Sequence, residues 1–284
     1  MGAGAGAVCV EQFGLPALWG SLLLIVLSLA TVLLGVSRVI DSISFVAPVL
    51  LTSVLGLSLY TIVTNPDAFL ANLAWSNPAA AAISPWPLAA LLYASYNLIL
   101  TVAVLAPLGT MSDRRSLHRG AIWGGLALGL GILSIAAAVL TLAPRVTSFE
   151  VPMVAIAGSI SPLARMAFSL VLFAEVYTTA VAGLYGFASR LAEQDSPHYK
   201  LFAIASSLSA FVLAQAGFST IVGTLYPAAG FAGFLLLGAL AYGYLKSLFT
   251  GTLLPAPAAK PEFLGKDEGT GTIDRETSNT KTEK

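Results

Sequence analysis

Seven long runs of apolar residues occupy most of the chain between Ala17 and Phe249. About 20 such residues in a helix cross the hydrocarbon core of a bilayer. Runs of this length pair their backbone groups internally only as α-helices, whereas membrane β-barrels have shorter, alternating strands. The runs cover Ala17–Val36, Ile43–Val63, Trp86–Leu108, Gly120–Leu142, Leu163–Ser189, Leu201–Val222 and Ala228–Phe249. The sequence therefore predicts an all-α polytopic membrane protein with about seven transmembrane helices.

The composition supports a lipid environment and divides the chain in two. Charged residues make up 10% of the 284 residues, against roughly 25% in a soluble protein. Residues 1–254 form the predicted transmembrane domain, and the charged residues 255–284 are expected to be a disordered cytoplasmic tail. The zero net charge gives no reason to expect nucleic acid as a partner. We expect the lipid bilayer and a small solute as partners, and no feature sets an oligomeric state.

Arginine and lysine recur in alternate connections between the runs. One set of connections holds Arg38, Arg114, Arg115, Arg119, Arg190, Lys200, Lys246 and the lysines and arginine of the tail. The other set holds only Arg145 and Arg165. Because cytoplasmic loops are enriched in these residues, we expect a cell-membrane protein with its N-terminus outside and its C-terminus in the cytoplasm. The apolar stretch Phe149–Ile160 is too short to span and is expected to be interfacial or re-entrant.

Glu175 lies in the middle of the run Leu163–Ser189. An acid at that depth costs about 2.5–3.5 kcal/mol on insertion scales, so a cation, a proton or a polar partner must offset it. Thr178 and Thr179 follow at i+3 and i+4, on the same helical face. We interpret Glu175, Thr178 and Thr179 as ion-coupling residues. The alternative is a protonated Glu175 bonded to another helix, with threonine hydroxyls bonded to their own backbone.

Ser95, Tyr96 and Asn97 are polar residues inside the run Trp86–Leu108. The Asn97 amide carries donors and an acceptor that lipid cannot satisfy, so it should face the protein interior or a wet cavity. We take these three residues as candidates for binding the solute, with interhelical hydrogen bonding as the alternative. The small and polar end of the run Leu201–Val222 favours close helix packing.

Motifs of enzyme and cofactor chemistry are absent from the sequence. It contains no HExxH, GxSxG or P-loop motif, and no lysine lies within a run to hold retinal. The single Cys9 excludes an internal disulfide, and no Cys/His cluster has metal-ligand spacing. We therefore expect no enzyme activity and no cofactor other than a bound sodium ion.

Several short blocks recur in the order found in one known family. They are Ala3-Gly4-Ala5-Gly6-Ala7, Glu11-Gln12-Phe13-Gly14-Leu15-Pro16, Ser95-Tyr96-Asn97, Ala106-Pro107-Leu108-Gly109, Glu175 with Tyr177-Thr178-Thr179-Ala180, Gly217-Phe218-Ser219, and Gly223-Thr224-Leu225-Tyr226-Pro227. On these blocks the chain resembles the YkvI-like bacterial membrane proteins. That family is similar to the amino acid–polyamine–organocation carriers, which share the inverted-repeat fold of the sodium-coupled leucine transporter.

The resemblance implies about ten helices in the whole carrier, of which this N-terminally truncated chain holds helices four to ten. Solute would bind at the midplane between discontinuous helices one and six, and Trp86–Leu108 would be helix six. However, this run has no Gly or Pro between Leu88 and Ala106 to mark a break. The run Leu163–Ser189 would be helix eight, where Thr178 and Thr179 match paired sodium-binding hydroxyls.

The sequence thus leads us to expect a secondary transporter, or a fragment of one. Its solute would be a small organic molecule such as an amino acid, moved with sodium or with protons. The alternative is a non-transporting membrane sensor or assembly partner whose intramembrane polar residues serve packing.

Overall fold

The computed structural model describes residues 1–34, 37–77, 83–194 and 196–250. All secondary structure in these ranges is helical, which confirms the all-α prediction. The helices are α1 (Gly2–Phe13), α2 (Ala17–Leu34), α3 (Ser37–Thr64), α4 (Pro66–Ala71), α5 (Trp86–Met111), α6 (Arg114–Leu142), α7 (Pro152–Ile160), α8 (Pro162–Leu191), α9 (Pro197–Ala214) and α10 (Phe218–Thr250). The predicted tail, residues 255–284, lies outside the described residues.

Five helices in the described ranges are long and apolar enough to cross a membrane. They are α2, the part of α3 from Val46 to Thr64, α6, α8, and α10 as far as Phe249. Of the other two predicted segments, α5 contributes the shorter apolar stretch Trp86–Val102, and α9 opens with the polar sequence Pro197-His198-Tyr199-Lys200. The structure therefore confirms a polytopic helical membrane protein.

Short local signals start three of these helices. Asp113, Ser161 and Ser196 each accept a hydrogen bond from a backbone N–H three residues later, which caps α6, α8 and α9. Proline follows the two serine caps, at Pro162 and Pro197. Its fixed φ and missing N–H suit the first helical position.

The predicted segment Leu201–Val222 is wrong in its extent. The helix α9 ends at Ala214, and a new helix, α10, begins at Phe218. Gly217 between them has φ +89°, a conformation open to glycine at low cost. The residues on both sides of this turn are apolar, so hydropathy alone predicts one continuous segment across it. The residues after the turn belong to α10, which runs on through Pro227.

The helix α1 was not predicted, because its 12 residues are too few to span a membrane and its first six are only glycine and alanine. It packs closely on α2. A Cβ at Gly6 would come within 2.8 Å of the Ala17 carbonyl oxygen, so glycine allows the two backbones to approach.

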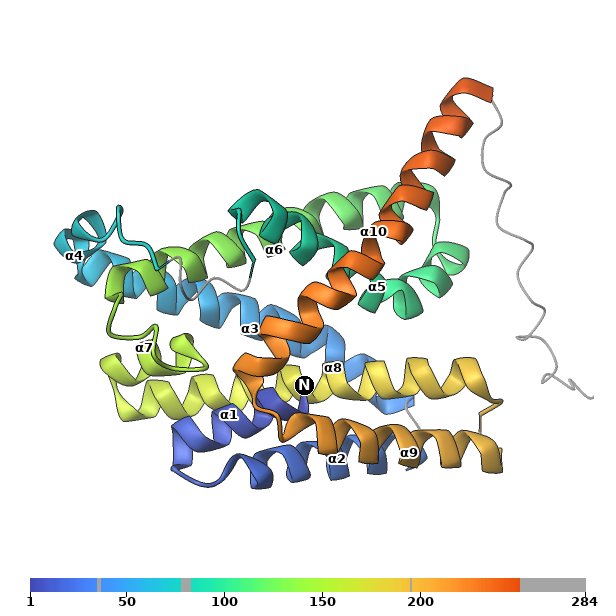
Figure 1. The fold of residues 1–284 in the computed structure, drawn as a ribbon, viewed down its shortest axis with the longest axis horizontal. Helices are drawn as coiled ribbons and strands as arrows, with labels where there is room; N and C mark the ends of the chain where they lie inside the picture. The colour runs from blue at the N-terminus through green and yellow to red at the C-terminus, as the bar shows by residue number, and fades with distance from the viewer. Residues whose placement is uncertain (35–36, 78–82, 195, 251–284) are drawn as a thin grey trace, which may run out of the picture.

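Figure 1 shows α1, α2, α8 and α9 side by side in the lower part of the molecule, with α3 and α6 above them. The helix α10 crosses upward and packs chiefly against α5. The short helix α7, which forms from the predicted apolar stretch Phe149–Ile160, buries Val154 and Ile156 against α3, α6 and α8.

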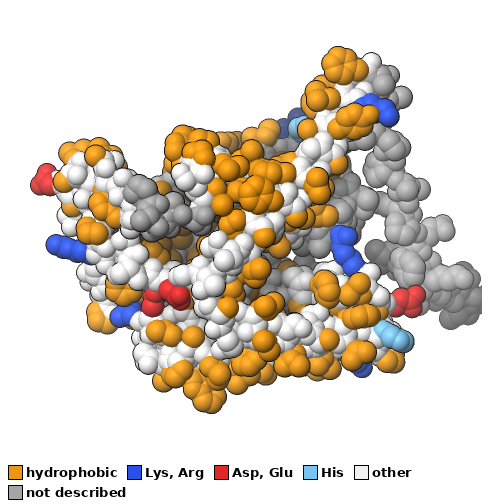
Figure 2. Space-filling view, viewed as in Figure 1, with side chains coloured by type: hydrophobic (Ala, Val, Ile, Leu, Met, Phe, Trp, Pro, Cys, Tyr) orange, Lys and Arg blue, Asp and Glu red, His pale blue; other side chains and the backbone are white. Residues whose placement is uncertain are grey.

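A second core joins three helices of the lower part. Val32 of α2, Val181 and Ala188 of α8, and Tyr199 and Ala203 of α9 are all buried there. Hydrophobic side chains nevertheless cover much of the face seen in Figure 2. Such apolar outer surfaces fit a bilayer environment.

Candidate functional site

Glu175 lies near the middle of α8 and is half-buried. Its Oε2 atom is fully buried and has no hydrogen-bond partner among the described residues. A buried carboxylate oxygen without a partner is costly in a low-dielectric environment. A bound cation or a proton would remove most of that cost.

The two threonines after Glu175 differ in their surroundings. Thr178 is buried, and its Oγ1 donates to the backbone oxygen of Glu175 at 3.0 Å. Thr179 is exposed. Thr178 thus bonds to the backbone of its own helix, as the structural alternative expects, and the Thr179 side chain is exposed. A role for Glu175, Thr178 and Thr179 in ion coupling stays a prediction.

A hydrogen bond between α2 and α8 lies beside Glu175 and was not predicted. The Tyr177 hydroxyl and Thr31 Oγ1 are 2.6 Å apart. Thr31 donates its own proton to the Leu27 carbonyl oxygen at 2.8 Å. Tyr177 is therefore the donor in the interhelical bond, and it ties α8 to α2 within a turn of the buried acid.

Ser95 joins α5 to α10. Its Oγ is buried and donates to the Gly230 carbonyl oxygen at 2.7 Å. A Cβ at Gly233 would lie within 2.6 Å of the Ser95 backbone oxygen, so the two helices are in close contact. This geometry matches the alternative of interhelical hydrogen bonding for Ser95.

Tyr96 and Asn97 make different contacts from Ser95. The centre of the Tyr96 ring lies 4.8 Å from the centre of the Tyr226 ring on α10 and 5.3 Å from that of Tyr93. Asn97 is partly buried and donates from Nδ2 to the Tyr93 carbonyl oxygen at 2.8 Å, within its own helix. Solute binding by Ser95, Tyr96 and Asn97 also stays a prediction.

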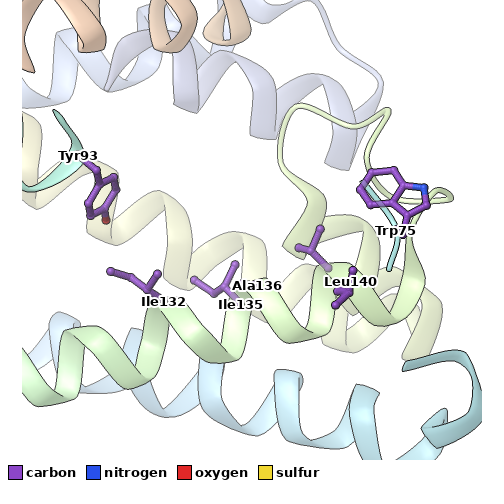
Figure 3. Close-up of a pocket in the computed structure, with 7 residues that line it drawn as sticks. Trp75, Tyr93, Ile132, Ile135, Ala136 and Leu140 are labelled. Atoms are coloured by element: carbon purple, nitrogen blue, oxygen red, sulfur yellow. The ribbon is translucent and has the colours of Figure 1, made fainter. Parts of the chain in front are cut away.

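A pocket of about 540 Å³ lies between α6 and the start of α5. Tyr93 stands at one end of it and Trp75 at the other, with α6 side chains between them (Figure 3). Its lining residues are Trp75, Tyr93, Ile132, Ile135, Ala136, Val139 and Leu140. The wall is apolar, so it suits the apolar part of an organic molecule.

Tyr93 links this pocket to the predicted solute residues, because its ring contacts that of Tyr96. The other end is positioned by Asn72, whose Nδ2 donates to the carbonyl oxygens of Thr141 and Ala143 at 3.2 and 2.9 Å. Sequence reasoning missed the pocket because its walls come from separate parts of the chain.

A second polar group of residues lies where α1 ends. Glu11 Oε1 accepts a hydrogen bond from the Val151 N–H at 3.0 Å, just before α7. Gln12 Oε1 accepts one from Ser169 Oγ of α8 at 3.2 Å. Glu150 Oε1 accepts one from Ser219 Oγ at the start of α10, at 3.1 Å. These bonds connect α1 to α8 and to the residues just before α7, and they connect those residues to α10.

Glu11 Oε2 is buried without a described hydrogen-bond partner, and so is Nε of Arg165, which lies in the first turn of α8. Burial raises the pKa of the Glu11 carboxyl, whereas the Val151 N–H and the Arg165 charge lower it by smaller amounts. In the sequence, the polar pair Glu11-Gln12 lies between the apolar residues Val10 and Phe13. This pattern is the signal that could have pointed to the polar group.

The raised pKa predicts how stability depends on pH. Because folded Glu11 holds its proton above the ordinary pKa of 4.5, its contribution to stability is present below that value. The contribution is lost as pH rises through the pKa of the folded state. Glu11→Gln keeps an acceptor for Val151 and removes the titration, so melting temperatures in detergent should vary less from acidic to neutral pH. Glu193→Gln, at an exposed acid, should keep the wild-type profile; identical profiles for wild type and Glu11→Gln would contradict the assignment.

The helices, the buried polar groups and the apolar surface together define a polytopic α-helical membrane protein. Among curated proteins, the chain is similar to the uncharacterized membrane protein YkvI of Bacillus subtilis (strain 168). The two are 30% identical over 242 residues, which cover 84% of this chain and 67% of YkvI. The chain belongs to the YkvI-like family of membrane proteins.

A second relative in the same organism is the uncharacterized protein YyaD. It is 26% identical over 234 residues, which cover 82% of this chain and 67% of YyaD. No family model matches the chain, and no solved structure matches it.

Proposed function

We propose that the chain forms membrane-spanning helices of a secondary transporter for a small organic solute. The observation that carries the proposal is the buried Oε2 of Glu175, near the middle of α8, which has no hydrogen-bond partner among the described residues. An acid at the centre of a span is costly and commonly marks an ion or proton path. Protonation or cation binding at Glu175 would couple the gradient to the solute. Gradient-driven uptake in proteoliposomes, by a full-length protein that contains this chain, tests this proposal.

The pocket beside α5 supports the solute side of the proposal. It has room for an organic molecule and is lined by one tyrosine, one tryptophan and aliphatic groups. An amino acid with an apolar side chain is our first candidate, because its side chain fits such a wall. Tyr96 and Asn97, one turn further along α5, would then bind its polar part.

The likeness to amino acid–polyamine–organocation carriers remains part of this proposal. The helix α5, which the likeness equates with a discontinuous helix six, runs without a break from Trp86 to Met111. A turn at Gln215–Gly217 instead separates α9 from α10. Sodium at Thr178 and Thr179 is the alternative to a proton at Glu175.

A non-transporting membrane role is the competing candidate, and two contacts favour it. The Ser95 hydroxyl donates a hydrogen bond to the Gly230 carbonyl oxygen, and the Tyr177 hydroxyl donates one to Thr31 Oγ1. Both bonds join helices, as expected of polar residues that serve packing. Glu175 is the residue that this reading leaves unexplained.

We also propose an orientation, with the start of α2 outside and the end of α10 in the cytoplasm. The start of α6, the end of α8, the start of α9 and the end of α10 all lie toward the right in Figure 1. These ends carry Arg114, Arg115, Arg190, Lys200 and Lys246. The basic residues of alternate connections thus lie toward one side, the pattern of a cytoplasmic face.

The orientation predicts which cysteines an impermeant reagent can reach from outside. In a Cys9→Ser background, cysteines replacing Asn77 and Ser148 should be labelled on intact cells, and one replacing Ser116 only after permeabilisation. All three native residues are exposed, so access depends on the side of the membrane. Labelling of the Ser116 site on intact cells, with the other two protected, would reverse the orientation.

A further inference from the structure

Three arginines stand together in the first two turns of α6. Arg114, Arg115 and Arg119 are exposed, as is His118 beside them. No hydrogen bond or ion pair joins the three guanidinium groups to another residue in the part of the chain that the structure describes. The neighbouring Asp113 is engaged as the N-cap, where its Oδ2 accepts from the Ser116 N–H at 3.0 Å. Hydrogen bonds from the hydroxyl and the backbone N–H of Ser116 lower the pKa of Asp113.

The length of α6 sets the depth of these arginines. Its 29 residues measure about 43 Å at 1.5 Å per residue, against roughly 30 Å of hydrocarbon. The apolar part from Ala121 to Leu142 measures about 33 Å and fills that thickness by itself. The first two turns of α6 therefore extend into the headgroup layer.

Trp123 marks the same boundary. It is 71% exposed and follows Arg119 by one helical turn. Tryptophan prefers the interface between hydrocarbon and headgroups. With Trp123 at that level, the three guanidinium groups lie at the level of the lipid phosphates.

Helix stability does not account for the arginines. Cations at the N-terminal end of a helix oppose its dipole, so three of them there are unfavourable unless an anion is near. A topological signal requires positive charge in the connection but no particular depth. An anionic group beside the arginines satisfies both the charge and the depth.

We propose that the surface formed by Arg114, Arg115 and Arg119 binds the phosphate headgroups of anionic phospholipids. Guanidinium groups bind phosphate oxygens in pairs of parallel hydrogen bonds. Basic clusters beside a membrane span attract anionic lipid by charge. The inference stands apart from the proposed transport, because it uses no residue of the pocket and none near Glu175.

Trp123 provides a reporter one turn from the surface. A chain with Trp19, Trp75 and Trp86 replaced by phenylalanine would be placed in mixed vesicles that contain brominated phosphatidylglycerol or brominated phosphatidylcholine. Bromine quenches tryptophan on contact, so the ratio of quenching reports the local lipid composition. We expect an enrichment of phosphatidylglycerol of at least about fivefold, the effect of a single basic side chain near the surface, lowered by high salt. Changing all three arginines to glutamine should remove the enrichment, and changing them to lysine should retain part of it.

Two controls complete the test: a second tryptophan reporter and competition by inorganic phosphate. A chain that keeps only Trp19, which begins α2 on the opposite side in Figure 1, should show no enrichment. Equal quenching by both lipids at Trp123, or enrichment that survives the three glutamines, would overturn the proposal. Inorganic phosphate that abolishes the enrichment, where sodium chloride of equal ionic strength does not, would show a site for free phosphate and also overturn it.

Discussion

Replacing Glu175 with glutamine is expected to abolish uptake driven by a pH gradient, with the amount of folded protein unchanged. Glutamine keeps the size and hydrogen-bonding capacity of the side chain but cannot release or bind a proton at this position. It also removes the cost of a buried charge near the middle of α8. A loss of at least about 100-fold in the gradient-driven rate is the scale expected when a required proton carrier is removed. The measurement is initial uptake into proteoliposomes, normalised to folded protein.

Glu193→Gln is the matched control, because Glu193 is an exposed acid just beyond the end of α8. It should keep the wild-type rate. If sodium is the coupling ion, Thr178→Val should weaken apparent sodium affinity more than solute affinity, because it removes a hydroxyl and fills a similar volume. Full pH-driven uptake by Glu175→Gln, with sodium dependence intact in Thr178→Val, would remove these residues from the mechanism and favour the packing role.

Replacing Gly233 with alanine should destabilise the α5–α10 pair by about 1–3 kcal/mol or more. The new Cβ would lie within 2.6 Å of the Ser95 backbone oxygen and 2.9 Å of its carbonyl carbon. These are backbone atoms, so the two helices must separate to make room. Separation would also lengthen the hydrogen bond from Ser95 to Gly230. Unfolding by heat or by sodium dodecyl sulfate, followed through tryptophan fluorescence, measures the change.

Gly238 lies in the same helix and supplies the control. An added Cβ there meets no atom within 4 Å, so alanine should be neutral or stabilise the helix by up to about 1 kcal/mol. Ser95→Ala, which removes only the hydroxyl, should cost about 1 kcal/mol. Equal stabilities for Gly233→Ala and Gly238→Ala would show that α5 and α10 do not pack as described.

The membrane-spanning helices could be predicted because a long apolar run has one stable form in lipid. The position of Glu175 in a span followed from the same reasoning. The turn at Gly217 was missed, because the residues on both sides are apolar and hydropathy does not report φ. The helix α1 was missed since its small residues give no long run, although they allow its close contact with α2.

The roles of individual polar residues depend on distant partners. Ser95 bonds to a carbonyl group 135 residues away, and Tyr177 to a hydroxyl 146 residues away. A single sequence places each of these residues on a helix but does not say which other helix it meets. The pocket between Trp75 and Tyr93 depends in the same way on the packing of α6.

Uptake by a full-length protein that contains this 284-residue chain tests the central claim most directly. The purified protein would be placed in liposomes with an imposed proton or sodium gradient and offered labelled amino acids with apolar, polar and charged side chains. The proposal predicts uptake of at least one apolar amino acid, driven by one of the two gradients and abolished when that gradient is dissipated. Uptake equal to that of protein-free liposomes for every solute and both gradients, from protein shown to be folded, would contradict it.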